Sequence, residues 1–211
     1  MTDLIQRGEA YILRTCASDM TSYGDFVWPR EGRVEAPDWR PDVKCGGGLH
    51  GFLWGEGDGM LANWRPDAVW LVARIGEWID LGGKVKAPSA EVVFAGDRLG
   101  AVAHLVLLGA KGAIVGSTLT GGDGSTLTGG DGSTLTGGDR STLTGGYRST
   151  LTGGDGSTLT GGDGSTLTAK WWDAAAVRYR VVVAYVGEDG IVAGTAYRLN
   201  GSRFVTAEAA R

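Results

Sequence analysis

The pattern of apolar and polar positions changes near residue 117. Before it, short apolar runs bounded by polar residues or glycine are typical of β-strands, at 10–15, 68–75 and 90–96. After it, one leucine recurs every eight residues in polar, glycine-rich sequence up to residue 168. Residues 177–186, VRYRVVVAYV, then favour a strand again. We therefore expect three parts, residues 1–113, 114–168 and 169–211.

One helix is expected in the first part, over residues 97–109. Asp97 is a suitable N-cap, and Gly109 is a suitable terminator. Four apolar residues with i, i+3, i+4, i+7 spacing predict the packed face. They are Leu99, Val102, Ala103 and Val106. The long turn-rich segment 27–59 contains Trp28, Trp39 and Trp54, which we expect to fix the loops to the core.

The octapeptide Ser-Thr-Leu-Thr-Gly-Gly-Asp-Gly occurs, with small variations, seven times from residue 117. Its first four residues suit a strand, and its glycines suit a tight turn. A disordered linker is the alternative, because glycine, serine and threonine dominate. A linker depends on composition and not on register, so the strict period favours a folded array.

Repeats that cannot bury a face alone do so by stacking. Two octapeptides per turn give a parallel β-solenoid of 16-residue coils, with serine and leucine inside and both threonines outside. The expected core is Leu119, Leu127, Leu135, Leu143, Leu151, Leu159 and Leu167. One outer surface, Thr face 1, contains Thr118, Thr120, Thr134, Thr136, Thr150, Thr152, Thr166 and Thr168. The other, Thr face 2, contains Thr126, Thr128, Thr142, Thr144, Thr158 and Thr160.

The turns of such a solenoid stack residues 16 apart. One edge would carry Asp123, Asp139 and Asp155, and the other Asp131, Tyr147 and Asp163. Stacked carboxylates about 4.8 Å apart repel each other by roughly 0.9 kcal/mol per pair in water. Arg140 and the pair Tyr147-Arg148 depart from the consensus, and two explanations stay open: relief of this repulsion, or sequence drift.

The stretch STLTGGYRSTLTGG resembles the octapeptides of bacterial ice nucleation proteins. The resemblance covers the array, about a quarter of the chain, and the flanks do not resemble that family's terminal domains. It implies a solenoid whose Thr-X-Thr rows order water. The family's tyrosine ladder is reduced to Tyr147, and its arrays are far longer, so we do not expect potent ice nucleation by a monomer. The segment CGGGLHG (45–51) is also similar to uncharacterised bacterial and phage domains, which implies no activity.

The last part of the chain reads as a small antiparallel β cap. Trp171 and Trp172 directly follow the last STLT, and we expect them to close the end of the leucine stack, as solenoids require. Residues 187–190, GEDG, suit a turn. Asn200-Gly201 is the dipeptide that favours a type I′ hairpin.

Charge and composition limit the classes of partner and the location that we expect for the protein. The 211 residues include 20 basic and 24 acidic ones, a net charge of -4, which gives no general attraction to nucleic acid or anionic membranes. We see no signal peptide and no apolar run of about 18 residues, so membrane insertion is not expected and a cytoplasmic location is the default. Export by another route stays open. Cys16 and Cys45 are expected to be reduced, with one disulfide as the alternative.

Catalytic chemistry has one candidate location, a glycine-rich loop with Cys45, His50, Glu56 and Asp58. Their spacing fits no zinc pattern, and a Cys45/His50 nucleophile pair rests on proximity in sequence alone. His104 lies in the helical pattern and is expected to be structural. The octapeptide does not match the GGxGxD nonapeptide of calcium-binding repeats. We therefore expect no metal and no cofactor.

These observations predict a mainly β, α+β protein: an α+β N-terminal domain, a short β-solenoid and a β cap. The leading hypothesis is a non-enzymatic protein whose Thr faces bind ice, ordered water or a glycan, or another copy of the chain. The alternative is an enzyme or small-ligand domain around His50, with the array as a spacer. Removing one coil distinguishes them, because a spacer tolerates shortening and an array that binds weakens with length.

Overall fold

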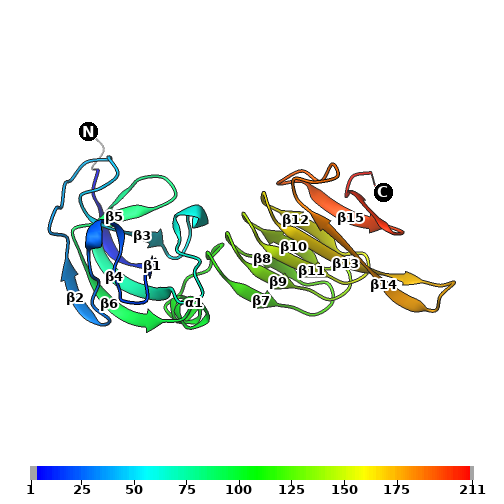
Figure 1. The fold of residues 1–211 in the computed structure, drawn as a ribbon, viewed down its shortest axis with the longest axis horizontal. Helices are drawn as coiled ribbons and strands as arrows, with labels where there is room; N and C mark the ends of the chain where they lie inside the picture. Colours follow the sequence, from blue (N-terminus) through cyan, green and yellow to red (C-terminus); the bar gives the residue numbers. More distant parts are fainter. Residues whose placement is uncertain (1–3, 210–211) are drawn as a thin grey trace. The chain divides into compact units, whose positions relative to one another are not determined.

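The computed structural model describes residues 4–209. They form two compact units, an N-terminal unit that ends at Ile114 and a solenoid unit that begins at Val115. Both consist mainly of β-strands (Figure 1). Within the described residues, no helix is long and apolar enough to cross a membrane.

The N-terminal unit is built on a curled six-stranded sheet with the order β1-β3-β5-β4-β6-β2, in which β1 also pairs with β4. The three strands predicted from the sequence are confirmed within β1, β4 and β6. The short 3-10 turns are Tyr23–Asp25 and Gly59–Leu61. The strands are β1 (Gln6–Cys16), β2 (Gly32–Glu35), β3 (Leu49–Leu53), β4 (Val69–Asp80), β5 (Val85–Ala87) and β6 (Ser89–Gly96).

Aromatic residues and a buried lysine hold the loops of this unit. Trp28 is buried in the core, and Trp54 packs edge-on against Tyr11. The fully buried Lys86 lies against Trp39, and its Nζ donates to Asp42 Oδ1 at 2.8 Å and to two backbone carbonyls of the same loop. A buried ammonium is stable only with such partners, so Lys86 fixes this loop to β5.

The helix α1 (Arg98–Leu107) begins as expected, because Asp97 accepts a hydrogen bond from the Gly100 N–H at 2.7 Å. Its predicted packed face is wrong except for Val102. The buried residues are Ala101, Val102 and Leu105, whereas Leu99, Ala103 and Val106 are exposed. The sequence carries two overlapping apolar stripes, and the one with the small Ala101 permits closer packing of helix on sheet. His104 stacks on Phe94.

The solenoid unit has the predicted 16-residue coil. Thr118 pairs with Thr134, and Thr126 pairs with Thr142, in parallel register, and the relation repeats through the array. Successive strands therefore alternate between two sheets (Figure 1). The strands are β7 (Thr118–Thr120), β8 (Thr126–Thr128), β9 (Thr134–Thr136), β10 (Thr142–Gly145), β11 (Thr150–Gly153), β12 (Thr158–Gly161) and β13 (Thr166–Asp173).

Antiparallel strands finish both sheets at their C-terminal end. β14 (Arg178–Tyr185) pairs with β13, and β15 (Ala196–Asn200) pairs with β12 and with β16 (Arg203–Thr206). The hairpin pairs Asn200 with Arg203, so Gly201 and Ser202 form its turn and only Gly201 has positive φ. The type I′ turn predicted at Asn200-Gly201 is therefore wrong, because Asn200 still belongs to the ladder.

The residues that cover the end of the leucine stack are Val186, Ile191 and Tyr197, all buried in the same cluster as Leu167. Trp171 and Trp172, expected to do this, lie elsewhere. β13 continues past the width of the solenoid, so residues 170–173 pair only with β14, and Trp172 packs on Tyr179. The expected cap exists as a meander, but these tryptophans belong to its protruding hairpin.

Candidate functional site: the two threonine faces

Burial divides each octapeptide into an interior and a surface. Leu135, Leu143, Leu151, Leu159 and Leu167 are fully buried, and Leu119 and Leu127, at the first coil, are partly buried. All serines of the array except Ser125 are buried as well. No threonine of the array is buried. The threonines thus form two outward surfaces over a buried leucine and serine interior.

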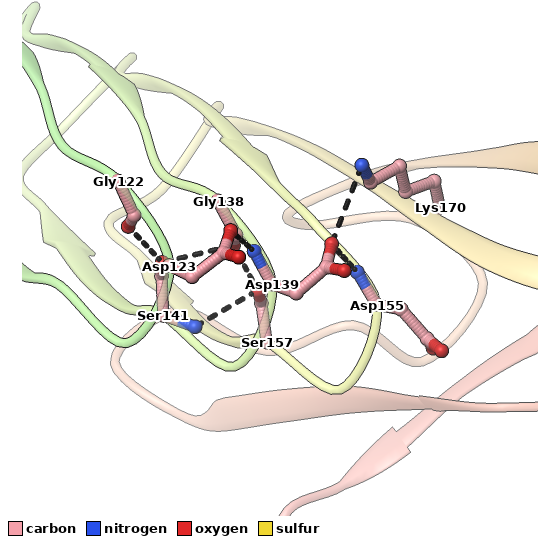
Figure 2. Close-up of polar contacts among 8 residues, drawn as sticks. All are labelled: Gly122, Asp123, Gly138, Asp139, Ser141, Asp155, Ser157 and Lys170. Carbon is pink, nitrogen blue, oxygen red and sulfur yellow. Dashed lines mark hydrogen bonds and ion pairs between the residues drawn. The ribbon is translucent and has the colours of Figure 1, made fainter.

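The buried serines are satisfied by the backbone of the coils. Ser141 Oγ donates to the Gly138 carbonyl at 2.9 Å, and the Ser141 N–H donates to Ser157 Oγ at 3.2 Å (Figure 2). Ser133 and Ser149 have the same backbone N–H contact to the serine of the next coil. Because unpaired hydroxyls cost free energy in an interior, this ladder explains why serine is compatible with burial.

The aspartate columns also do more than repel. Asp123 Oδ1 accepts from the Asp139 N–H at 2.8 Å, and Asp139 Oδ1 accepts from the Asp155 N–H at 3.0 Å (Figure 2). Asp131 likewise accepts from the Tyr147 N–H. This bond to Asp155 is the main cause that lowers the pKa of Asp139, followed by Lys170, whose Nζ lies 3.3 Å from Asp139 Oδ1. The aspartates thus link successive coils, a role that the sequence analysis missed.

The departures from the consensus turn carry backbone strain. Arg140 and Arg148 have φ values of 57° and 51°, in the left-handed region that Gly124, Gly132, Gly156 and Gly164 occupy at the same octapeptide position. Arg140 is a weaker influence on the pKa of Asp139 than Lys170. At Asp139, Arg140 therefore contributes less than Lys170, and both explanations for the departures from the consensus stay open.

Replacing Arg140 by glycine is expected to stabilise the solenoid unit by about 0.5–1 kcal/mol. Left-handed backbone costs a non-glycine residue about 1–2 kcal/mol, and part of that gain is lost to the greater freedom of glycine in the unfolded chain. The midpoint of chemical denaturation measures the change. Gly156→Arg is the reverse substitution and should shift the midpoint downward; equal midpoints for both variants would contradict the strain.

Thr face 1 is the larger of the two surfaces and has an apolar border. It covers the sheet β14-β13-β11-β9-β7, and on β14 the residues paired with Thr166 and Thr168 are Tyr185 and Val183. Both are about half exposed. Lys170 follows on β13, but its ammonium is directed to Asp139 at the turn edge. The threonine rows of face 1 therefore carry no charge themselves, and Lys170, whose ammonium also lies 4.7 Å from the Tyr179 ring centroid, is the cation at their border.

Thr face 2 covers β12, β10 and β8 and has a charged border. Arg198 on β15 donates from Nε to Thr158 Oγ1 at 2.8 Å. One threonine hydroxyl of this face is thus occupied by a hydrogen bond from a guanidinium. The two faces share a repeat but differ in size and in charge.

The four residues of the alternative site make separate contacts in the N-terminal unit. Exposed Cys45 accepts a hydrogen bond from Lys84 Nζ at 3.1 Å, and this contact is the main cause that lowers the pKa of the thiol. Asp58 accepts from the Met60 N–H and begins a 3-10 turn, and the Glu56 carboxylate lies close to Gly112. Within residues 4–209, no three metal-ligating side chains gather in one place. Cys16 and Cys45 are both free thiols.

His50 lies on β3 in cationic surroundings. Burial and then the positive charges of Lys84, Arg14 and Lys86 lower its pKa to about 4. The neutral form is therefore the folded form. In the unfolded chain the pKa of His50 is about 6.5, so below that pH the unfolded chain binds a proton at His50 that the folded chain does not bind. The free energy of unfolding therefore falls as the pH is lowered from about 6.5 to 4.

His50→Gln is expected to flatten this part of the stability profile. Glutamine is similar in size and does not titrate, so its melting temperature should fall less than that of the parent from pH 6.5 to 4. Tryptophan fluorescence follows melting of the N-terminal unit, which contains six of the eight tryptophans. Parallel profiles for both proteins would contradict the assignment.

Comparison with known proteins shows which proteins part of this chain is similar to. No family model and no solved structure matches the chain. An ice nucleation protein of Pseudomonas fluorescens is 41% identical over 98 residues, 44% of this chain and 8% of that protein. One from Pseudomonas syringae is 39% identical over 97 residues, also 44% of this chain and 8% of its own length. Ice nucleation protein InaU of Pantoea ananas is 33% identical over 106 residues, 48% and 10% of the two chains.

The matched stretch corrects one expectation from the sequence. Residues 117–168 are too few to hold a match of 97 to 106 residues, so the similarity includes sequence that flanks the array. The expectation that the resemblance covers only the array, about a quarter of the chain, is therefore wrong, whereas the expected difference between the flanks and that family's terminal domains stays a prediction. The matched part spans about a tenth of the relatives' length or less. The chain thus resembles the repeats of ice nucleation proteins over about half of its own length.

Proposed function

We propose that the protein is a non-enzymatic repeat protein that binds ice or ordered water through Thr face 1. The observation that supports this most is the regular outward array of threonines over a rigid, buried ladder. Strand spacing repeats the side chains about every 4.8 Å across the sheet, and strand rise repeats them about every 6.6 Å along each strand. Each threonine offers one methyl and one hydroxyl, so the surface alternates apolar and hydrogen-bonding groups in two dimensions.

Face 1 is favoured over face 2 by its borders. A surface that holds ordered water gains from the absence of charges, because charged groups impose their own hydration. Face 1 continues onto Val183 and Tyr185, whereas Arg198 engages Thr158 on face 2. The similarity to ice nucleation proteins supports ice or ordered water as the ligand and does not distinguish the two faces.

A matched coil deletion tests this function. Residues 149–164 form one whole coil of consensus sequence, so their removal joins equivalent positions and keeps the cap. We expect the intact chain to show thermal hysteresis or to raise the freezing temperature of droplets, and the shortened chain to show less of either at equal stability. Activity equal to buffer in the intact chain would remove the ice proposal. Equal activity of both chains would place the activity outside the array.

A further inference from the structure

The longest free strand edge in the described chain belongs to β14. β14 ends its sheet, with β13 as its strand neighbour, and it has eight residues. The strands β7, β8, β2 and β16 at other sheet ends have three or four, and the longer β1 pairs with β3 and with β4. Its outer face carries Tyr179, Val181, Val183 and Tyr185, which are 49%, 65%, 48% and 52% exposed. Long, apolar, unpaired edges are rare in monomeric proteins, because they readily pair with another strand.

The backbone of β14 presents its free groups on the same alternate residues. The Val186 N–H donates to the Ser165 carbonyl at 2.8 Å, and the register then opposes Ala184 to Leu167 and Val182 to Ala169. Hydrogen-bonded pairs alternate along an antiparallel ladder, so the even-numbered residues of β14 bond to β13. The odd-numbered residues therefore direct their N–H and C=O groups to the free edge.

The strand is complementary to itself. An antiparallel pairing with a two-fold axis at Val182 opposes Tyr179 to Tyr185 and Val181 to Val183 of the other copy. It opposes Arg180 to Ala184, so no arginine faces an arginine, and Arg180 is already bonded to Asp173 in its own hairpin. Aromatic and β-branched cross-strand pairs are the stabilising kind, and residues 181–185 carry no charge that would block the edge.

We propose that β14 is a dimerisation edge that pairs antiparallel with β14 of a second copy of this chain. The interface is isologous: each copy contributes the same strand, and the two inner sheets join into one. A two-fold axis perpendicular to the sheet keeps its faces, so the Thr faces 1 of both copies lie on the same side. Dimerisation through β14 does not depend on the proposed function. Only its benefit, a binding surface of twice the size, rests on that function.

Sedimentation velocity of the full chain over a range of concentrations tests the dimer. Val181→Lys with Val183→Lys keeps exposed positions exposed, but it opposes lysine to lysine across the axis. We expect the dissociation constant to rise about tenfold or more. Val192→Lys is the matched control, an equally exposed valine outside β14, and should leave it unchanged. A wild-type chain that is monomeric throughout, or equal effects of both substitutions, would overturn the proposal.

A cross-link tests the register independently of stability. Val182 lies on the axis in a pair without backbone hydrogen bonds, where Cα atoms approach to about 4.5 Å, within disulfide range. In a Cys45→Ser background, the Val182→Cys chain should oxidise to a covalent dimer, whereas the Val192→Cys chain should stay monomeric. Non-reducing denaturing electrophoresis distinguishes the two. A dimer in solution that Val182→Cys does not trap would overturn the β14 pairing. If the cross-linked dimer freezes droplets at no higher temperature than the Val181→Lys, Val183→Lys variant, the dimer is still supported. The benefit of a doubled Thr face 1 is then contradicted.

Discussion

Replacing Leu143 by alanine is expected to destabilise the solenoid unit by about 2–5 kcal/mol. Leu143 lies at the centre of β10, is fully buried, and stacks between Leu127 and Leu159 of the neighbouring coils. The lost transfer free energy adds to the cost of a cavity that the stacked backbone cannot close, because every strand is held by its neighbours. That loss is a large part of the stability of a domain of this size.

Thr144→Ala is the matched control, one residue away on the same strand but exposed. Its effect should stay within about 0.5 kcal/mol, as for most surface positions. Denaturant unfolding followed by far-ultraviolet circular dichroism measures both variants. Similar losses at Leu143 and Thr144 would mean that the leucines are not a buried column.

Gly138→Ala is expected to be comparably damaging, by overpacking and not by backbone strain. A Cβ at Gly138 would lie 2.6 Å from Asp123 N and 2.8 Å from Gly122 C of the preceding coil, and would also meet Asp123 Oδ1. These contacts are with backbone, so relief requires the coils to separate. Overpacked sites typically cost about 1–3 kcal/mol, and here the Asp123 to Asp139 hydrogen bond is at risk as well.

Gly122→Ala is the ideal comparison because Gly122 occupies the same octapeptide position in the first coil. With no earlier coil beside it, a Cβ there meets nothing within 4 Å. We expect Gly122→Ala to leave the denaturation midpoint nearly unchanged, or to raise it slightly by reducing unfolded-state freedom. If both alanines behave alike, the stacking of residues 16 apart is wrong.

The array was predictable from sequence because its information is local and repeated. A leucine every eight residues and alternation within STLT determine the coil length and the face of every side chain. The same pattern could not reveal the hydrogen bonds of Asp123 and Asp139. Their carboxylates bond to backbone N–H groups that come within reach only after the coils have stacked.

Features that depend on tertiary packing were less predictable. The α1 sequence supports two apolar stripes, and only the close approach at Ala101 selects between them. Trp171 and Trp172 follow the array in sequence, yet the length of β13 carries them past the leucine stack. Lys86 gave no signal, because a lysine is buried only where several acceptors converge on it.

The difference between the threonine faces also came from structure alone. In sequence, Arg198 and Val183 lie far from most of the threonines, and only the register of β14 and β15 places each beside one sheet. That register places the guanidinium of Arg198 on a threonine of face 2, whereas Lys170, the cation beside face 1, is paired with Asp139. The proposal of a single binding face rests on it.

Droplet freezing of two single-lysine variants tests that proposal most directly. Thr150 on face 1 and Thr142 on face 2 are both exposed and occupy the same position in successive octapeptides. The variants Thr150→Lys and Thr142→Lys therefore differ only in the face that receives the charge. At equal melting temperature, we expect Thr150→Lys to lower the freezing temperature toward that of buffer and Thr142→Lys to retain most of the wild-type value. Equal loss in both variants, or a larger loss for Thr142→Lys, would contradict face 1 as the binding surface.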